Sequence, residues 1–276
     1  MHDPAHAPAQ PALIPTTLFV QQSGAGTPLL LIHGLMVSGE MYQPVLPALA
    51  SHYRVIVPDL RGHGRSGALP GPYSVEQLAR DLAQLLDDLQ VDSAHILGYS
   101  QGGAVAQQFA RDYPKRVRGL VLGCTFAYNM LSRRERVEGI LAPWFVRILG
   151  MRRVARLLMS GVGGGQRMSP ESARWLQEIL AANDTARMVA AVEAMYAFDS
   201  RPWLDQIRCP TLVIAGAEDT GVPLPHAHML AQGIPGAQLR VVDGAGHALI
   251  WTHTDIFVEA VEAFLASVNR TFDTVY

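Results

Sequence analysis

The sequence is poor in cysteine, and this shortage excludes a disulfide-stabilised scaffold. Only Cys124 and Cys209 occur among 276 residues, and each borders an apolar, strand-like run. Two cysteines make no disulfide framework, so we expect two buried free thiols. Long apolar runs are also missing. None approaches the roughly 18 residues that a membrane span needs, so we expect no membrane contact.

Charge is scarce too, and it has no excess of one sign. Charged residues make up 17% of the chain, the formal net charge is -2, and Lys115 is the only lysine. Such a chain lacks the basic excess that neutralises nucleic-acid phosphates. We therefore expect no nucleic-acid partner.

Residues 1–15 lack the basic start and apolar core of a secretory signal. They are rich in alanine, proline and histidine, and we predict a mobile tail there. Without a secretion route, the two formal glycosylation matches at 183–185 and 269–271 are chance matches. We expect the protein to be cytoplasmic.

Strand-like and helical segments alternate over most of the chain. The segments that predict strands are the alternating segment 17–22 and the runs 28–32, 54–58, 94–97, 118–123, 211–215 and 238–242. The segments between and after them that predict helices are 40–51, one beginning at Ser74, 102–112, 224–232 and 255–267. This alternation with short connections predicts an α/β fold with a doubly wound, mostly parallel sheet. We assign it to residues 16–125 and 201–276.

The alternation stops between residues 126 and 200. The segments there with a helical pattern are 133–141, 143–150, 152–159, 170–182 and 186–198, with a glycine-rich loop at 161–165. An all-helical block inserted between strands indicates a cap, so we predict a helical cap over 126–200. Its arginines could steer an anionic substrate, although a solvated helix face explains such residues more often.

A candidate nucleophile lies where the fourth predicted strand meets a helix. Gly98-Tyr99-Ser100-Gln101-Gly102 has a Gly-x-Ser-x-Gly pattern. The glycines make room for a sharp, strained turn that exposes the Ser100 hydroxyl, and the following helix directs its positive end at charge beside it. The pattern alone equally suits a glycine-rich turn with a solvated serine. Its context decides between the two.

A serine hydroxyl needs a neighbouring base, and the base needs a carboxylate that fixes its tautomer. In a parallel sheet, functional groups gather beyond the carboxyl ends of the strands. Of the ten histidines, His247 is the preferred base, because it follows a strand in a glycine-flanked loop. Asp219 ends a strand and is the preferred acid, with Glu218 and Asp243 as alternatives.

The other polar residues at strand ends receive structural interpretations. We predict that His33 supports an oxyanion loop, that His63 braces its own loop, and that Asp59 braces the loop of Arg61. The sequence has no cluster of ligands at metal-binding spacing. We expect no metal and no cofactor.

Together these motifs resemble the α/β-hydrolase fold superfamily. The residues that carry the resemblance are His33-Gly34, the segment 59–66, the segment 98–102, the Asp219 loop with Val222-Pro223, and Gly246-His247. They stand in the superfamily's order and at its usual spacing over nearly the whole chain. The segment 59–66 followed by 71–74 is similar to the enol-lactonase and cofactor-free haloperoxidase branches.

The resemblance implies that Ser100 is the nucleophile, His247 the general base and Asp219 its orienting acid. It also implies an oxyanion hole made by the backbone amides of Leu35 and Gln101. A serine at the elbow is typical of the esterase-like branches. We therefore expect hydrolysis of an ester, lactone or thioester of a small to medium acyl substrate through an acyl-enzyme.

Substrate contacts are predicted for Tyr99, Trp144 and Met195. Many similar enzymes have methionine where this chain has Gln101, and this polar side chain leaves the substrate open. One alternative is carbon–carbon bond hydrolysis of vinylogous diketones on the same triad. The other is a non-catalytic ligand-binding protein, whose sequence mark would be a missing triad residue.

Overall fold

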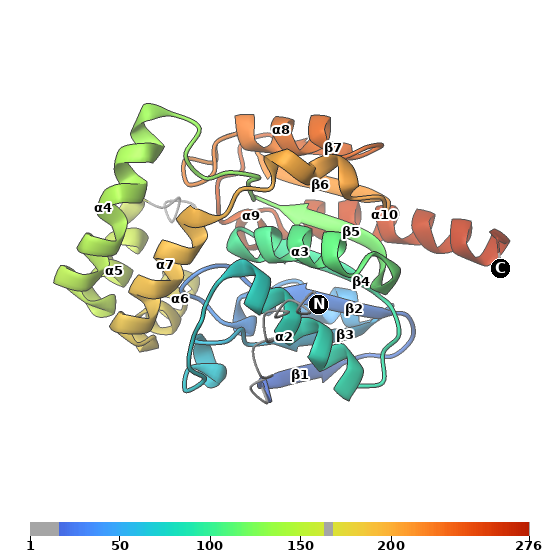
Figure 1. Ribbon diagram of the computed structural model, residues 1–276, viewed down its shortest axis with the longest axis horizontal. Coiled ribbons are helices and arrows are strands. Elements are labelled where there is room, and N and C mark those ends of the chain that lie inside the picture. The colour runs from blue at the N-terminus through green and yellow to red at the C-terminus, as the bar shows by residue number, and fades with distance from the viewer. Residues whose placement is uncertain (1–16, 163–167, 276) are drawn as a thin grey trace, which may run out of the picture.

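A computed structural model describes residues 17–162 and 168–275 of the chain. The predicted tail at 1–15 and most of the predicted glycine-rich loop at 161–165 lie outside these residues. The strands are β1 (Val20–Ser23), β2 (Pro28–Ile32), β3 (Arg54–Pro58), β4 (Ala94–Tyr99), β5 (Val117–Gly123), β6 (Thr211–Gly216) and β7 (Gln238–Val242). They form one sheet in the order β1-β3-β2-β4-β5-β6-β7 (Figure 1).

The sheet is mostly parallel and covered on both faces, as predicted. Only β1 runs antiparallel, beside β3 at the edge. Alternate residues of β2 enter different cores: Leu30 and Ile32 pack with α2 (Val75–Asp88), α3 (Gln101–Asp112) and α8 (Pro225–Gly233). Leu29 and Leu31 pack with α1 (Leu46–Ala50) and α10 (Thr254–Val275). Burial on both faces explains why the strands are continuously apolar.

Several element limits differ from the prediction. The helix expected at 40–51 is divided into the 3-10 helix η1 (Gly39–Tyr42) and α1, because Pro44 lacks the backbone N–H that a continuous helix requires. The first strand begins at Val20, and α10 continues beyond the expected end at 267. The remaining short helices outside residues 126–200 are η2 (Gly64–Ser66), η3 (Pro114–Arg116), η6 (Arg201–Gln206) and α9 (Leu249–Thr252).

The start of α2 shows half of a capping box. The Ser74 hydroxyl accepts a hydrogen bond from the Gln77 amide at 3.3 Å, as an N-cap residue does. The Gln77 side chain does not return to the Ser74 backbone, because its amide donates to Asp81 at 2.8 Å. The spacing of Ser74 and Gln77 is typical of a capping box, but only one of its two hydrogen bonds forms.

Between β5 and β6 the chain forms α4 (Arg133–Leu149), α5 (Met151–Leu157), the π-helix η4 (Leu158–Val162), α6 (Pro170–Ala182) and α7 (Thr185–Ala197). Figure 1 shows these helices as a group at the left, to one side of the sheet. The predicted break before Pro143 is wrong, since α4 runs through this residue. Packing of α4 against α7 compensates for the hydrogen bond that a proline cannot donate.

The two ends of this helical insertion are tied together. Tyr128 and Asp199 form an isolated antiparallel bridge, and the Ser200 amide donates to the Ala127 carbonyl at 2.9 Å. Gln107 of α3 accepts from the Ser200 hydroxyl at 2.7 Å. The insertion is therefore anchored to the helix that follows Ser100.

Candidate active site

Ser100 occupies a strained turn between β4 and α3. Its φ of 54° and ψ of -123° lie where side chains other than glycine rarely occur. A Cβ at Gly98 would collide with the backbone oxygen of Gly102, and a Cβ at Gly102 would collide with that of Ile32. Both glycines are therefore needed for this turn, as the sequence pattern predicted.

The loops after β4, β6 and β7 bring Ser100, Asp219 and His247 into one hydrogen-bonded chain. The Ser100 Oγ lies 3.2 Å from His247 Nε2. On the other side of the ring, His247 Nδ1 lies 2.8 Å from Asp219 Oδ2. With the Nδ1 proton on the carboxylate side, Nε2 is free to accept the serine proton. The arrangement suits proton transfer from a nucleophilic serine.

Backbone amides orient Asp219. Its Oδ1 accepts hydrogen bonds from Gly221 N and Val222 N, both at 2.8 Å, which leaves Oδ2 for His247. The alternative acids Glu218 and Asp243 are exposed. Burial raises the pKa of Asp219, but the charge of His247 and these hydrogen bonds outweigh it and lower the pKa overall. The carboxylate thus stays ionised beside the ring.

His247 is held from behind by Tyr99. The Tyr99 hydroxyl donates to the His247 carbonyl at 2.7 Å, and the Tyr99 side chain is buried. Burial lowers the pKa of His247, but the charge of Asp219 and its hydrogen bond raise the pKa overall. The sequence predicted a substrate contact for Tyr99. The structure instead gives its hydroxyl a contact with the backbone that carries His247.

The predicted oxyanion loop lies against Ser100. A Cβ at Gly34 would be 3.2 Å from the Ser100 Cβ and 3.7 Å from its Oγ, so a side chain here would crowd Ser100. His33 is buried, donates from Nδ1 to the Gly34 carbonyl at 2.8 Å and accepts at Nε2 from Leu60 N at 2.8 Å. Burial lowers the pKa of His33 and keeps it neutral for both contacts. These contacts fix the backbone that leads into Leu35.

Asp59 braces the segment after β3, as predicted. It accepts from Gly39 N at 2.8 Å and from the backbone N and Nε of Arg65, both at 2.9 Å, so it holds the loop of Arg61 through Arg65. Arg61 is buried and pairs with Asp81 of α2, with contacts of 2.6 and 2.9 Å. The sequence had given Asp81 no role.

His63 braces its own loop. Its Nδ1 donates to the Arg61 carbonyl at 3.0 Å. Burial, with the nearby His33, lowers the pKa of His63 to about 3, so the ring stays neutral. This contact agrees with the role that the sequence predicted for His63.

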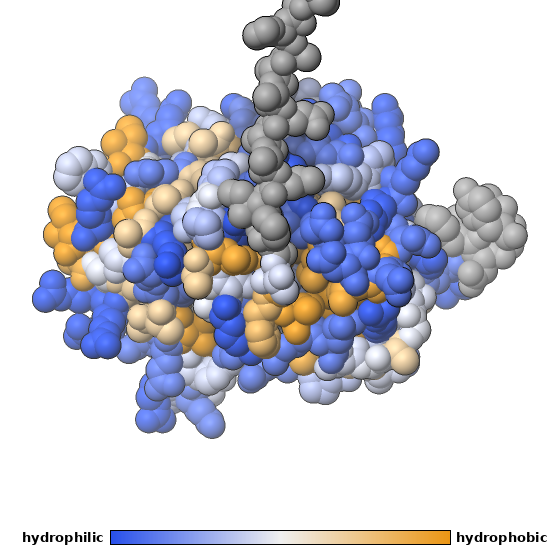
Figure 2. All heavy atoms as spheres, turned by 60° about the horizontal axis from the view of Figure 1, so that its bottom comes forward, coloured by the Kyte–Doolittle hydropathy of each residue, from blue (hydrophilic) through white to orange (hydrophobic). Residues whose placement is uncertain are grey.

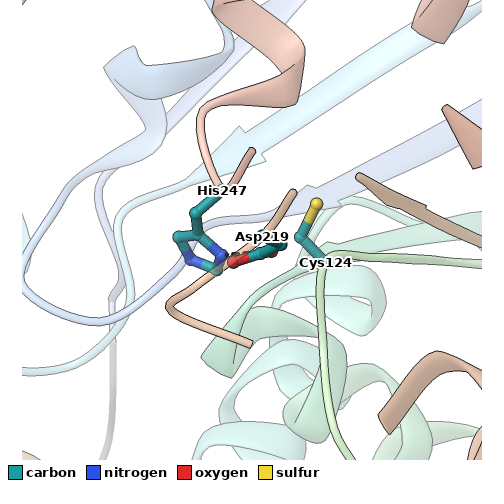
Figure 3. A group of neighbouring side chains, drawn as sticks. All are labelled: Cys124, Asp219 and His247. Atoms are coloured by element: carbon teal, nitrogen blue, oxygen red, sulfur yellow. Dashed lines mark hydrogen bonds and ion pairs between the residues drawn. The ribbon is translucent and has the colours of Figure 1, made fainter. Parts of the chain in front are cut away.

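Cys124 lies beside the acid–base pair, which the sequence did not predict. Its Sγ, a carboxylate oxygen of Asp219 and a ring nitrogen of His247 all lie within 4.8 Å of one another (Figure 3). These three side chains could hold a metal ion only if the Cys124 thiol were deprotonated to the thiolate. Burial raises the pKa of Cys124 and keeps it a thiol, while His247 Nδ1 is engaged by Asp219. The group therefore fits an acid–base pair better than a metal centre.

The remaining predicted site residues differ in burial. Met195 of α7 is buried in the core that contains Phe198 and Trp203. Trp144 of α4 is 61% exposed, which does not suit the lining of a closed acyl pocket. Gln101 is fully buried at the start of α3, and among the described residues neither of its side-chain polar atoms has a partner.

The sequence did not predict the contacts that hold Asp219 and His247 in place. The amides of Gly221 and Val222 hold Asp219, and the Tyr99 hydroxyl holds the His247 loop. The position of Val222-Pro223 directly after the acid was the only sequence signal of these contacts.

Residues 27–254 match the family model of the alpha/beta hydrolase fold. RutD of Azorhizobium caulinodans, a proposed carbamate hydrolase, is 35% identical over 92% of this chain and 96% of its own. The poly(3-hydroxyalkanoate) depolymerase of Ectopseudomonas oleovorans is 34% identical over 87% of this chain and 84% of its own. The crystal structure of the enol-lactonase from Burkholderia xenovorans is 27% identical, with a TM-score of 0.81, over 90% of this chain and 96% of that chain. Among the described residues, no helix is long and apolar enough to cross a membrane. The chain belongs to the α/β-hydrolase fold family, and it is a hydrolase.

Proposed function

We propose that this hydrolase cleaves a carboxylic ester or lactone of a small to medium acyl substrate, with Ser100 as nucleophile, His247 as general base and Asp219 as its orienting acid. The observation that carries the proposal is the continuous hydrogen-bonded chain from Ser100 Oγ through both ring nitrogens of His247 to Asp219. A thioester is attacked by the same chemistry.

The reaction proceeds in two halves. The Ser100 Oγ forms a bond to the carbonyl carbon while its proton moves to His247 Nε2. The bond from that carbon to the leaving oxygen then breaks, and the leaving oxygen takes the proton from His247. In the second half, water gives its proton to His247 and attacks the acyl-enzyme. The acid is released, and Ser100 recovers its proton.

Backbone amides of Leu35 and Gln101 are the proposed donors to the carbonyl oxygen as it becomes negative. The Gln101 amide begins α3, where a helix has free N–H groups and a positive dipole end. Leu35 follows Gly34, whose backbone lies against Ser100. Loss of one such donor costs about 3 to 4 kcal/mol of transition-state stabilisation.

The relatives support an ester or lactone as the substrate. Their names specify a poly(3-hydroxyalkanoate) and an enol-lactone, both of which contain the acyl–oxygen bond that Ser100 would attack. We propose that residues 126–200 act as a cap and that substrate preference resides there, with Met195 as a contact. No cofactor or metal is needed for this route.

A carbamate is a second candidate substrate, and two observations favour it. RutD, the relative of 35% identity, is a proposed carbamate hydrolase. The buried side chain of Gln101 has one donor group and one acceptor group without partners among the described residues. These groups match the carbonyl and N–H of a carbamate. No comparable observation favours a diketone.

A panel of chromogenic esters, lactones and carbamates of different chain lengths tests the proposal. We expect the wild type to turn over at least one ester or lactone and Ser100→Ala to turn over none. In Gln101→Met we expect turnover to differ less between substrates with different acyl groups. Equal inertness of wild type and Ser100→Ala across the panel would refute hydrolysis and support a non-catalytic binding protein.

A further inference from the structure

The helix α4 has an apolar face that points away from the protein. Six large apolar side chains on it are between 43% and 70% exposed: Val137, Ile140, Leu141, Trp144, Phe145 and Ile148. Their spacing of three and four residues places them along one side of the helix. We call these six residues the outer face of α4.

The opposite side of α4 already has its packing partner. Gly139 lies against the ring of Tyr196 on α7, and Val146 is buried. Near the helix start, Glu135 pairs with His226 of α8 at 2.7 Å. The direction of α4 is therefore fixed by these contacts, and its outer face is turned to solvent. Figure 2 shows hydrophobic surface among hydrophilic atoms at the left edge, on the side where Figure 1 places α4 to α7.

The surroundings of the outer face are strongly basic. Helices α4 and α5 together carry seven arginines against two glutamates, a formal charge of +5, in a chain whose net charge is -2. Arg147 lies on α4, and Arg152, Arg153 and Arg156 are exposed on α5. The three arginines of α5 line an open hollow of about 520 Å³ beside the end of α4, and Asp184 is the one acidic residue in its lining.

We propose that the outer face of α4 and the arginines of α5 bind the surface of an anionic lipid assembly. Exposed aliphatic and aromatic side chains enter the boundary between headgroups and acyl chains, and arginines attract the anionic headgroups. A second copy of this chain fits less well, because a symmetric contact would bring two basic surfaces together. This inference does not depend on the bond that the enzyme hydrolyses.

The helix would lie on the lipid surface and not cross it. Among the described residues, no helix meets the requirements for a membrane span. We expected no membrane contact because the sequence has no long apolar run. That criterion detects only segments that span a membrane. An interfacial helix is recognised by the exposure of its apolar side, which the structure supplies.

Sedimentation with lipid vesicles tests the proposal on the full chain. One set of vesicles is pure phosphatidylcholine, and the other contains one third phosphatidylglycerol. We expect at least tenfold stronger binding to the anionic vesicles, and a loss of binding in high salt. Glycerol phosphate in solution should not compete, because the apolar contacts require a surface. Absence of binding to both vesicle types would overturn the proposal.

Variants of α4 and α5 separate the apolar contribution to lipid binding from the electrostatic one. Ile140→Gln with Ile148→Gln should weaken binding about tenfold, whereas Ile256→Gln, at a side chain that is 38% exposed on α10, should leave it unchanged. Replacing Arg152, Arg153 and Arg156 by glutamine should reduce anionic binding about fivefold for each arginine. Equal binding of wild type and the double variant would contradict the proposal. So would a dimer in sedimentation equilibrium that the double variant abolishes, without vesicle binding.

Tryptophan fluorescence gives a readout on the unaltered chain. The other tryptophans are half-buried or buried, so Trp144 is the expected source of a blue shift when anionic vesicles are added. Trp144→Phe should bind with similar affinity but lose the shift. Binding of the wild type without any shift would show that another surface is used.

Discussion

The carboxyl edge of the sheet and the outer face of α4 both contain side chains with unusual burial. At the sheet edge charged side chains are buried, and on α4 apolar side chains are exposed. At the sheet edge, charged groups such as Asp219 are buried and each has defined hydrogen-bond partners. On α4, apolar groups such as Ile140 are exposed and have no such enclosure. Burial of charge requires compensation within the fold, whereas exposure of apolar surface indicates a partner outside it.

The largest expected effect tests the buried side of this comparison. Asp219→Asn should leave the fold intact and reduce kcat about 10⁴-fold, because an amide does not hold the productive tautomer of His247. Steady-state kinetics on the preferred substrate, with circular dichroism as a folding control, measures this. Near-normal turnover would transfer the acid role to Glu218 or Asp243.

The ion pair under the segment after β3 should matter for stability. Asp81→Ala leaves the buried guanidinium of Arg61 without its carboxylate, and we expect a loss of about 3 to 5 kcal/mol in the free energy of unfolding. Urea denaturation measures this. The matched control is Glu138→Ala, which removes the partner of Arg134 in an exposed pair and should leave the denaturation midpoint unchanged. Similar midpoint shifts in both variants would contradict the distinction between the two pairs.

A smaller effect is expected where the support of the triad is indirect. Tyr99→Phe removes only the hydroxyl that donates to the His247 carbonyl, so kcat should fall about tenfold while KM changes little, because the His247 loop is less well held. A change confined to KM would instead support the substrate contact that the sequence predicted for Tyr99.

The pH dependence of kcat/KM reports on the coupling between His247 and Asp219. A protonated imidazole cannot accept the serine proton, so kcat/KM should fall as the pH drops through the pKa of His247. Because Asp219 raises this pKa above its ordinary value of 6.5, the acid limb should lie above pH 6.5. Asp219→Asn removes the groups that raise the pKa and should move the limb to lower pH. An unmoved limb would mean that another group titrates.

The outer face of α4 should give the smallest effect on the fold. Ile140→Gln replaces a side chain that is 70% exposed and should change the free energy of unfolding by no more than about 0.5 kcal/mol. Urea denaturation would reveal a larger loss, which would mean that Ile140 packs within the fold and that the outer face is not free to bind a surface.

Much of the fold and the meeting of Ser100, Asp219 and His247 could be predicted from the sequence, because both are set by local patterns. Apolar runs gave the strands, the Gly-x-Ser-x-Gly pattern gave the turn at Ser100, and parallel strands bring Asp219 and His247 to the same edge. The partners of buried groups were not predictable in this way. Asp81 reaches Arg61 from a helix 20 residues away in sequence, and only the packing of that helix brings the two together.

The direction of a helix face was also beyond the sequence. An apolar stripe usually predicts a buried side, and a substrate contact was predicted for Trp144. Contacts of Gly139 and Glu135 turn this side of α4 outward instead. The helix break predicted before Pro143 was wrong for a related reason. Tertiary packing keeps α4 continuous through this residue.

Labelling with a fluorophosphonate, followed by intact-protein and peptide mass spectrometry, tests the central claim that Ser100 is an activated nucleophile. A neutral His247 within 3.2 Å of its Oγ should drive the reaction of one label per chain at Ser100. Labelling should be absent in Ser100→Ala and strongly slowed in His247→Ala. Labelling at another residue, or equal rates in wild type and His247→Ala, would contradict it.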